Sequence, residues 1–311
     1  MSMVAAAAVF LFAAAQAQGQ TFEIVGRVEP AVRASVTLHG ATSAFTSSTL
    51  TAADGRFRFR NVAAGQYVVI AFSPGYGERR TTVDVGPASA DPRRRFEMTV
   101  RLDENTHVGA GAKVSAAELS VPDSARKEYN EAQKCLTRRD VPCAIARLER
   151  AVEIAPRYAG AWNNLGTIAY HAREYPKAES YFRRSLEADP QAYEPLVNLG
   201  GVLLSLNRPE DAYHFNLHSV LARPMDALAN SQLGMTYFML GKPDLAEKYL
   251  LEARKLDPAH FSHPQLFLAE IYLRRRETAK AADALEEFLR HHPNSPNADK
   301  MRAEVDRLRA R

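Results

Sequence analysis

Four carboxamide side chains recur along the second half of the chain and could form a hydrogen-bonding ladder. Asn130, Asn164 and Asn198 stand 34 residues apart, and Gln232 continues the series at the same interval. A carboxamide offers both donors and an acceptor, so a row of them can pair with the backbone of an extended peptide whatever its sequence. The alternative is that each Asn caps or orders the neighbouring helix. The series is a candidate peptide-binding site.

Apolar side chains must supply much of the affinity of such a site. Three Asn with two hydrogen bonds each give roughly 3–9 kcal/mol, whereas association costs about 4–15 kcal/mol. We expect the apolar contacts on the same face to be Val197, Leu204, Met235, Phe238, Met239, Leu266 and Leu273. Met and Phe suit an adaptable groove. The sequence supports equally well a role for these residues in the core between neighbouring repeats.

The two cysteines of the chain, Cys135 and Cys143, are candidates for a disulfide. We expect Cys135 near the end of one helix and Cys143 at the start of the next, with a turn around Arg139-Asp140 between them. An antiparallel hairpin of this kind brings the two Cβ atoms together, so we predict a disulfide. The alternative is a pair of buried thiols packed as small apolar groups.

The sequence contains no convincing catalytic or metal site. A phosphate-binding loop, a nucleophile elbow and a dinucleotide fingerprint are all missing. His214 and His218 stand four residues apart, as helical metal ligands can, but no third ligand is evident, so surface or packing roles are favoured. His291 and His292 are expected at a helix end, where they favour the helix dipole. We therefore expect neither an enzyme nor a bound cofactor or metal.

The candidate residues belong to a repeat of 34 residues. Five prolines mark it, with spacings of 34, 34, 34 and 35 residues: Pro156, Pro190, Pro224, Pro258 and Pro293. Small residues recur twelve and twenty-four residues before each of them. This period is typical of a two-helix solenoid unit, in which small residues let the paired helices cross closely. One unit buries too little apolar surface to fold alone, so we expect a stack of units.

These repeats resemble the tetratricopeptide repeat family. The resemblance rests on Trp162, Leu165 and Gly166, on Leu233-Gly234 with Tyr237, and on the recurring Ala and Pro. It covers a repeat domain of 123–293, with units at about 125–158, 159–192, 193–226, 227–260 and 262–295, and a capping helix is expected over 296–311. It implies an α superhelix whose first helices line a concave face, and the amide series is similar to the asparagine ladder of some grooves in this family. In the third unit Asn216 replaces the Phe182 and Leu250 of its neighbours, so we expect looser packing there.

Residues 21–103 alternate between apolar and polar side chains, as half-buried strands do. About seven short strands separated by turns such as Asp54-Gly55 predict an antiparallel β-sandwich. The run Asp54 to Phe59, followed by Gly65, Tyr67 and Gly75-Tyr76, resembles the carboxypeptidase regulatory-like domain of the transthyretin or prealbumin type. The resemblance implies an accessory module of extracytoplasmic proteins, without catalytic residues, that sometimes binds carbohydrate or surface components.

The first residues of the chain have the features of a secretory signal peptide. An apolar run over 4–15 is too short to span a bilayer, and Ala15-Gln16-Ala17 has the form of a cleavage site. We therefore expect a signal peptide over 1–17, a linker over 104–122, and a mature chain in the bacterial periplasm or secreted, with no transmembrane span. No Lys or Arg precedes the run, and a disordered Ala-rich tail is the alternative.

The charges are nearly balanced, with 40 basic and 36 acidic residues and a net charge of +4. No basic stripe with interleaved aromatic residues is present, which argues against a nucleic-acid partner, and Arg93-Arg94-Arg95 is expected to be solvated. The leading interpretation is a non-enzymatic scaffold of the bacterial cell envelope that binds an extended peptide in the concave groove. The alternatives are a carbohydrate- or cell-wall-binding protein that uses Phe45, Phe72 and Tyr76, and a part of an enzyme machinery whose catalytic subunit is separate.

Overall fold

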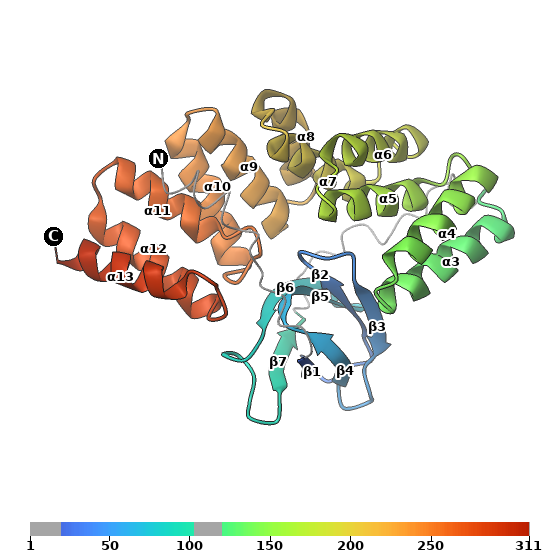
Figure 1. Cartoon of the computed structure of the whole chain (residues 1–311), viewed down its shortest axis with the longest axis horizontal. Coiled ribbons are helices and arrows are strands. Elements are labelled where there is room, and N and C mark those ends of the chain that lie inside the picture. Colours follow the sequence, from blue (N-terminus) through green and yellow to red (C-terminus); the bar gives the residue numbers. More distant parts are fainter. Residues whose placement is uncertain (1–19, 103–119, 311) are drawn as a thin grey trace.

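A computed structural model describes residues 20–102 and 120–310 of the chain. Within these ranges seven strands are followed by eleven helices, and the helices form an arc around one side of the β domain (Figure 1). The expected fold class, a β-sandwich followed by a helical solenoid, is confirmed. The expected signal peptide over 1–17 and most of the expected linker lie outside the described residues.

The β domain consists of two facing sheets. One sheet contains, in spatial order, β4 (Arg56–Ala63), β1 (Thr21–Glu29) and β7 (Arg95–Arg101). The other, which we call the docking sheet, contains β3 (Thr46–Leu50), β2 (Ser35–Gly40), β5 (Gly65–Ser73) and β6 (Gly77–Val85). One pairing differs from a wholly antiparallel sandwich, because β1 and β7 run parallel. The chain crosses from β6 in one sheet to β7 in the other, so no tight hairpin imposes the direction of β7.

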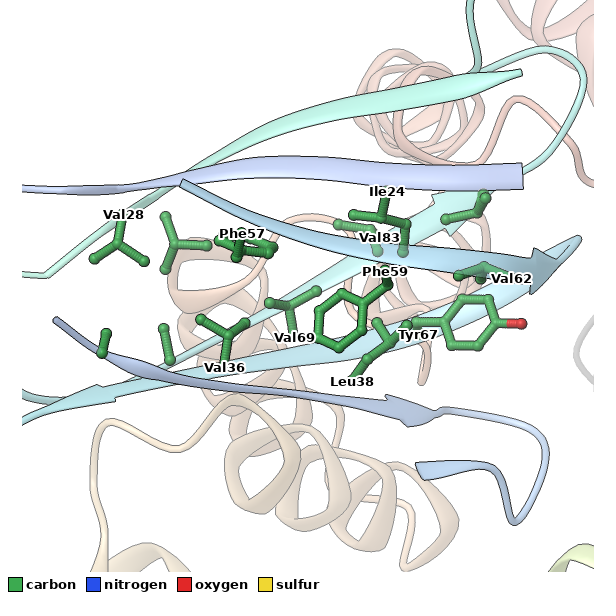
Figure 2. Packing of buried hydrophobic residues seen from close by; sticks show 14 of the residues in the cluster. Ile24, Val28, Val36, Leu38, Phe57, Phe59, Val62, Tyr67, Val69 and Val83 are labelled. Carbon is green, nitrogen blue, oxygen red and sulfur yellow. The ribbon is translucent and has the colours of Figure 1, made fainter. Parts of the chain in front are cut away.

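The sandwich core follows the predicted alternation of buried and outward side chains. Ile24 and Val28 of β1 face Val36 and Leu38 of β2 across the core (Figure 2). Tyr67 closes one end of the cluster, with its ring buried and its hydroxyl donating to the carbonyl of Ala63 at 2.9 Å. The two sheets are thus held together by a buried apolar layer.

The helices form five antiparallel hairpins and one final helix. The hairpins are α3 (Asp123–Thr137) with α4 (Val141–Ile154), α5 (Ala159–His171) with α6 (Tyr175–Ala188), α7 (Tyr193–Ser205) with α8 (Pro209–Ala222), α9 (Ala227–Met239) with α10 (Pro243–Leu256), and α11 (Pro264–Arg274) with α12 (Thr278–His291). The final helix α13 (Ala298–Arg309) packs on α12, as expected for a cap. No described helix is both long and apolar enough to cross a bilayer.

The recurring small residues lie where the two helices of a hairpin cross. A Cβ atom added at Gly166 would lie 2.6 Å from the ring of Phe182, and one at Gly234 would lie 2.7 Å from Leu250. In the third hairpin Gly200 meets Asn216 instead. Asn216 is fully buried, and its Nδ2 donates to Thr236 Oγ1 at 2.9 Å. A polar contact therefore replaces the apolar one of the neighbouring hairpins.

Candidate functional site

The first helices of the hairpins form the inner layer of the arc. Direct contacts join α5 to α7, α7 to α9 and α9 to α11, while α6 and α8 lie on the outer side of α5 and α7 (Figure 1). The β domain is on the inner side of the same arc. The candidate binding surface is therefore the inner layer made by the first helices.

Two of the predicted amides take part in links between successive first helices. Asn164 Nδ2 on α5 donates to Tyr129 Oη on α3 at 3.2 Å. Asn198 Nδ2 on α7 donates to Asn163 Oδ1 on α5 at 3.1 Å. Asn164 and Asn198 are half-buried, whereas Asn130 is exposed near the open end of the arc. Each of the two linking amides uses one N–H within the described residues, which leaves an acceptor oxygen for a ligand.

Gln232, the fourth member of the series, is placed differently. Its side chain is 8% exposed, and its Nε2 lies against Gly201, where an added Cβ would be only 2.5 Å away. Its Oε1 is buried and has no hydrogen-bond partner among the described residues. Gln232 therefore fills space between α7 and α9 rather than facing an open groove.

The predicted apolar contacts divide between core and surface. Val197 is 3% exposed and packs with Tyr193 and Ala229, so it belongs to the core between repeats. Leu204 is buried as well. Met235, Phe238, Leu266 and Leu273 are half-buried, and Met239 is 36% exposed. We call Met235, Phe238 and Met239 the apolar strip of α9.

An aromatic contact extends this strip onto the next first helix. The ring of Phe238 meets Phe267 on α11 edge to face, with centroids 5.6 Å apart. The guanidinium of Arg274 lies 4.7 Å from the centroid of Phe238, and Arg274 is paired with Glu270 at 2.9 Å. The inner layer is therefore rich in amides over α5 and α7 and apolar over α9 and α11.

The sandwich contacts the first hairpin of the arc. Thr137 Oγ1 donates to the carbonyl of Thr46 at 2.8 Å, and Arg139 Nη2 donates to Tyr67 Oη at 3.3 Å. The guanidinium of Arg139 lies 4.8 Å from the centroid of the Phe45 ring. Phe45 is thus part of an interface between domains, and a sugar-binding platform of Phe45, Phe72 and Tyr76 has no support.

The docking sheet also contacts the later hairpins. The backbone N and the Oγ1 of Thr82 donate to Asp257 Oδ2 at 2.9 and 2.7 Å. Arg80 lies 3.6 Å from Glu194 at the start of α7 and 3.9 Å from Asp226 at the start of α9. Although burial lowers the pKa of Arg80, nearby carboxylates outweigh it and raise the pKa. The sandwich therefore bridges the arc from its first hairpin to its last ones.

A cluster of buried histidines lies beneath this second contact. Gln66 Nε2 of β5 lies 3.1 Å from His292 Nδ1, and His292 Nε2 lies 3.3 Å from His263 Nδ1. His260, three residues before His263, is buried with them. Burial lowers the pKa of His292 to about 3 and that of His263 well below its ordinary value. His292 is the C-cap residue of α12, as expected for a helix end, but its burial and lowered pKa disfavour a charge that would interact with the helix dipole.

Asn294 completes the contact just after α12. Its Oδ1 accepts from the backbone N of Ala88 at 2.9 Å, and its Nδ2 donates to Ser89 Oγ at 3.2 Å. Its backbone N donates to Asp84 Oδ2 at 3.4 Å, while burial raises the pKa of Asp84. The sequence did not predict these contacts of Asn294. No local pattern marks polar side chains that meet across more than two hundred residues of chain.

Two of the cavities formed by the described residues open at the edges of the solenoid. The larger, about 380 Å³, lies between the β2–β3 loop and the first two hairpins, and its lining includes Ala44, Ile145, Ile168 and Tyr181. The smaller, about 270 Å³, lies beside Trp162 and Arg184. The first is within the size range of small-ligand sites, and its walls are mainly apolar.

The structure also bears on the remaining candidate residues. Cys135 and Cys143 are joined in a disulfide, with Cα atoms 5.8 Å apart. Over residues 20–102 and 120–310, no three His, Cys, Asp or Glu side chains are grouped so that they could hold a metal ion.

Stacked hairpins with a shared inner layer define a helical-repeat scaffold. Family models agree with this class. Residues 25–99 match the carboxypeptidase regulatory-like domain, and residues 129–193, 227–260 and 262–305 match tetratricopeptide repeat models. The chain thus contains a carboxypeptidase regulatory-like domain followed by tetratricopeptide repeats.

Curated relatives match parts of the repeat-containing chain. BBSome complex member BBS4 of Xenopus tropicalis is 33% identical over 72 residues, which are 23% of this chain and 14% of that protein. Anaphase-promoting complex subunit 6 of Arabidopsis thaliana is 26% identical over 175 residues, 49% of this chain and 32% of that protein. The chain thus spans a third or less of these relatives.

Solved structures match the solenoid. MamA (41-end) from Desulfovibrio magneticus RS-1 aligns with a TM-score of 0.50 and 21% identity, over 57% of this chain and 99% of that one. PilW, titled a widely conserved type IV pilus biogenesis factor, aligns with a TM-score of 0.50 and 21% identity, over 61% and 92%. At this identity the likeness concerns the fold alone.

Proposed function

We propose that this chain is a non-enzymatic scaffold of the bacterial cell envelope that holds an extended segment of a partner protein along the inner layer of its solenoid. The observation that carries the proposal is the pair of amides Asn164 and Asn198, which are aligned by hydrogen bonds to the preceding repeat. Such alignment fixes each carboxamide before a ligand arrives, which reduces the entropy lost on binding.

The two halves of the inner layer suit different parts of a bound segment. The amides over α5 and α7 can pair with backbone groups, which every peptide has. The apolar strip of α9, with Phe267 beside it, can accept side chains of varied shape because Met is flexible and Phe is large. The partner is therefore a peptide segment with apolar side chains toward one end.

The envelope location has two supports. The apolar run over 4–15, followed by the Ala-x-Ala cleavage site at residues 15–17, is typical of a secretory signal peptide. The disulfide between Cys135 and Cys143 is of a kind that persists in oxidising compartments. Cell fractionation and a mass measurement of the mature N-terminus test this part, and recovery of the uncut chain from the cytoplasm would contradict it.

Selection of a peptide ligand tests the groove. Peptides are selected from a random displayed library on the intact protein, and their affinity is measured by fluorescence polarisation. An Asn164→Ala/Asn198→Ala variant should bind at least about tenfold more weakly, because each lost hydrogen bond costs about 1 kcal/mol. The matched control is Gln191→Ala, since Gln191 is an exposed amide between α6 and α7. Unchanged affinity of a folded double variant would rule out the amides as the binding element.

A further inference from the structure

Arginine is concentrated on the outer face of the sheet β4-β1-β7. Along β4, Arg56, Arg58 and Arg60 alternate with buried side chains and point away from the core. The outward positions of β1 and β7 contribute three more arginines. We call these six residues the arginine face: Arg27, Arg56, Arg58, Arg60, Arg95 and Arg101.

Acidic residues on this face neutralise only part of the charge. The outward positions of the same strands hold three glutamates, Glu23, Glu29 and Glu97. Glu23 is shared, because it lies 3.4 Å from Arg58, 3.6 Å from Arg60 and 3.3 Å from Arg95. Arg101 is paired with Glu29 at 3.4 Å, and Arg56 is paired at 3.3 Å with Asp54, which lies just before β4. Six guanidinium groups against four carboxylates (Glu23, Glu29, Glu97 and Asp54) leave a surface with two excess positive charges.

One pair of these arginines is placed so that the two charges repel each other. Arg27 and Arg56 are directly opposite each other in the antiparallel pair of β1 and β4. Like charges at opposed positions destabilise a sheet. In the neighbouring outward pair of the same two strands, Val25 is opposite Arg58. The fold therefore does not require an arginine opposite an arginine. An external anion that lies across the strands would relieve the repulsion.

The arginine face points away from the solenoid. The described contacts of the sandwich with the helices come from the docking sheet, its loops and the turn after β6, and β1, β4 and β7 lie on the other side of the sandwich (Figure 1). A broad, flat partner can therefore approach this face without meeting the helices.

The chemistry of the face selects among anionic partners. Guanidinium groups bind phosphate oxygens in a bidentate manner. Alternate residues of a strand are about 6.8 Å apart, and neighbouring strands about 4.8 Å, so the groups form a planar grid. The outward positions of these three described strands hold no aromatic ring, so stacking on bases or sugar rings is not available. A plane of phosphates fits better than a nucleic acid or a polysaccharide.

We propose that the arginine face is a docking surface for a membrane rich in anionic phospholipid. Basic side chains near such a surface each raise the affinity severalfold, and the effect acts within a Debye length. The bound sandwich would lie flat on the membrane and hold the helical arc above it. This role is independent of the inner layer of the solenoid, so either function can be tested without the other.

Vesicle co-sedimentation of the purified full chain tests the proposal. Vesicles with about half phosphatidylglycerol should retain the protein at low salt and release it at about 0.5 M salt, whereas phosphatidylcholine vesicles should not bind it. Arg56→Gln/Arg58→Gln/Arg60→Gln should weaken binding on the order of 100-fold. Glu97→Gln, which removes an opposing charge on the same face, should strengthen it about fivefold.

A matched control separates the arginine face from net charge. Arg150→Gln/Arg276→Gln/Arg290→Gln removes three exposed arginines of the solenoid and should leave vesicle binding near that of the parent protein. Equal losses in the two triple variants would overturn the proposal, because net charge alone would then explain binding. Failure to bind the anionic vesicles would also overturn it, as would binding to polygalacturonate or single-stranded DNA in place of the vesicles.

Discussion

Thr82 and Asp257 join the sandwich to the solenoid through a single carboxylate oxygen. The backbone N and the hydroxyl of Thr82 both donate to Asp257 Oδ2, at 2.9 and 2.7 Å. The two residues are 175 positions apart and are 3% and 6% exposed. Because a buried carboxylate needs such donors, the contact holds the two domains at a defined distance.

Removal of this carboxylate should weaken the bridge between the domains. Hydrogen bonds to a charged group contribute about 1.5–3 kcal/mol each, so the loss of both in Asp257→Ala should lower the free energy of unfolding by about 3–6 kcal/mol. Thr82→Val should cost less, since it keeps the backbone donor, and Thr82→Ser should be close to the parent. Urea unfolding gives the free energies, and small-angle scattering gives the radius of gyration. Equal stability of all three variants would contradict the assigned role.

The buried histidines should make the protein sensitive to mild acid. Burial lowers the pKa of His292 from 6.5 to about 3, and the pKa values of His260 and His263 are lowered as well. Between about pH 3 and pH 6.5, His292 therefore binds a proton in the unfolded chain but not in the folded chain. Stability is therefore fully retained above pH 6.5 and falls as the pH drops below it, by about 1.4 kcal/mol per pH unit for each such histidine.

Urea unfolding at pH 7 and at about pH 5.5 checks the sign, because most carboxylates stay ionised in this window. His292→Gln should reduce the loss of stability by about 1.4 kcal/mol per pH unit. Asp84 acts in the opposite direction, since burial raises its pKa, so Asp84→Asn should steepen the loss. A protein that is equally stable at both pH values would contradict the assignment of neutral histidines.

The disulfide should stabilise the first hairpin, where the solenoid meets the sandwich. Cys135 and Cys143 are separated by 8 positions, and closing so short a loop contributes about 2 kcal/mol. A Cys135→Ala/Cys143→Ala variant should lose that amount, and the parent should lose it on reduction. Thiol titration of the unfolded, unreduced protein should detect no free thiol. Two reactive thiols would show that the bond is not formed in the cell.

Asn216 is a position where substitution should increase stability. Its Oδ1 is buried without a hydrogen-bond partner among the described residues, and leucine occupies the same position of the next hairpin as Leu250. Thr236 Oγ1 would keep its bond to the carbonyl of Gln232 at 2.7 Å. We expect Asn216→Leu to raise the free energy of unfolding by about 1–2 kcal/mol. A lower midpoint in thermal unfolding would mean that the space beside Gly200 is too small for leucine.

Local and periodic features of the fold could be predicted from the sequence. Gly166 and Gly234 recur in step because each lies at a helix crossing that admits no side chain, so the repeat was visible without coordinates. Asn164 and Asn198 were found by the same period. Gln232 shares the period but not the environment, because its burial depends on Gly201 of the neighbouring helix.

Contacts between the domains could not be predicted. Arg80 and Thr82 belong to an alternating strand and would be read as solvent-facing, and Asp257 would be read as a residue at the end of α10. Their partners depend on how the sandwich and the solenoid are placed relative to each other. The sequence contains no periodic signal for that placement. The parallel pairing of β1 with β7 escaped prediction for a similar reason, since the chain crosses between sheets before β7.

The bridge across the arc has a mechanical consequence. A free solenoid can flex like a spring, because small rotations between successive units add up along its length. Here the sandwich is attached to the first hairpin and to the last ones, so stretching or tightening the coil would require those attachments to break. The curvature is therefore set in advance, and a segment bound as proposed would have to match a fixed radius instead of selecting one from a range of shapes.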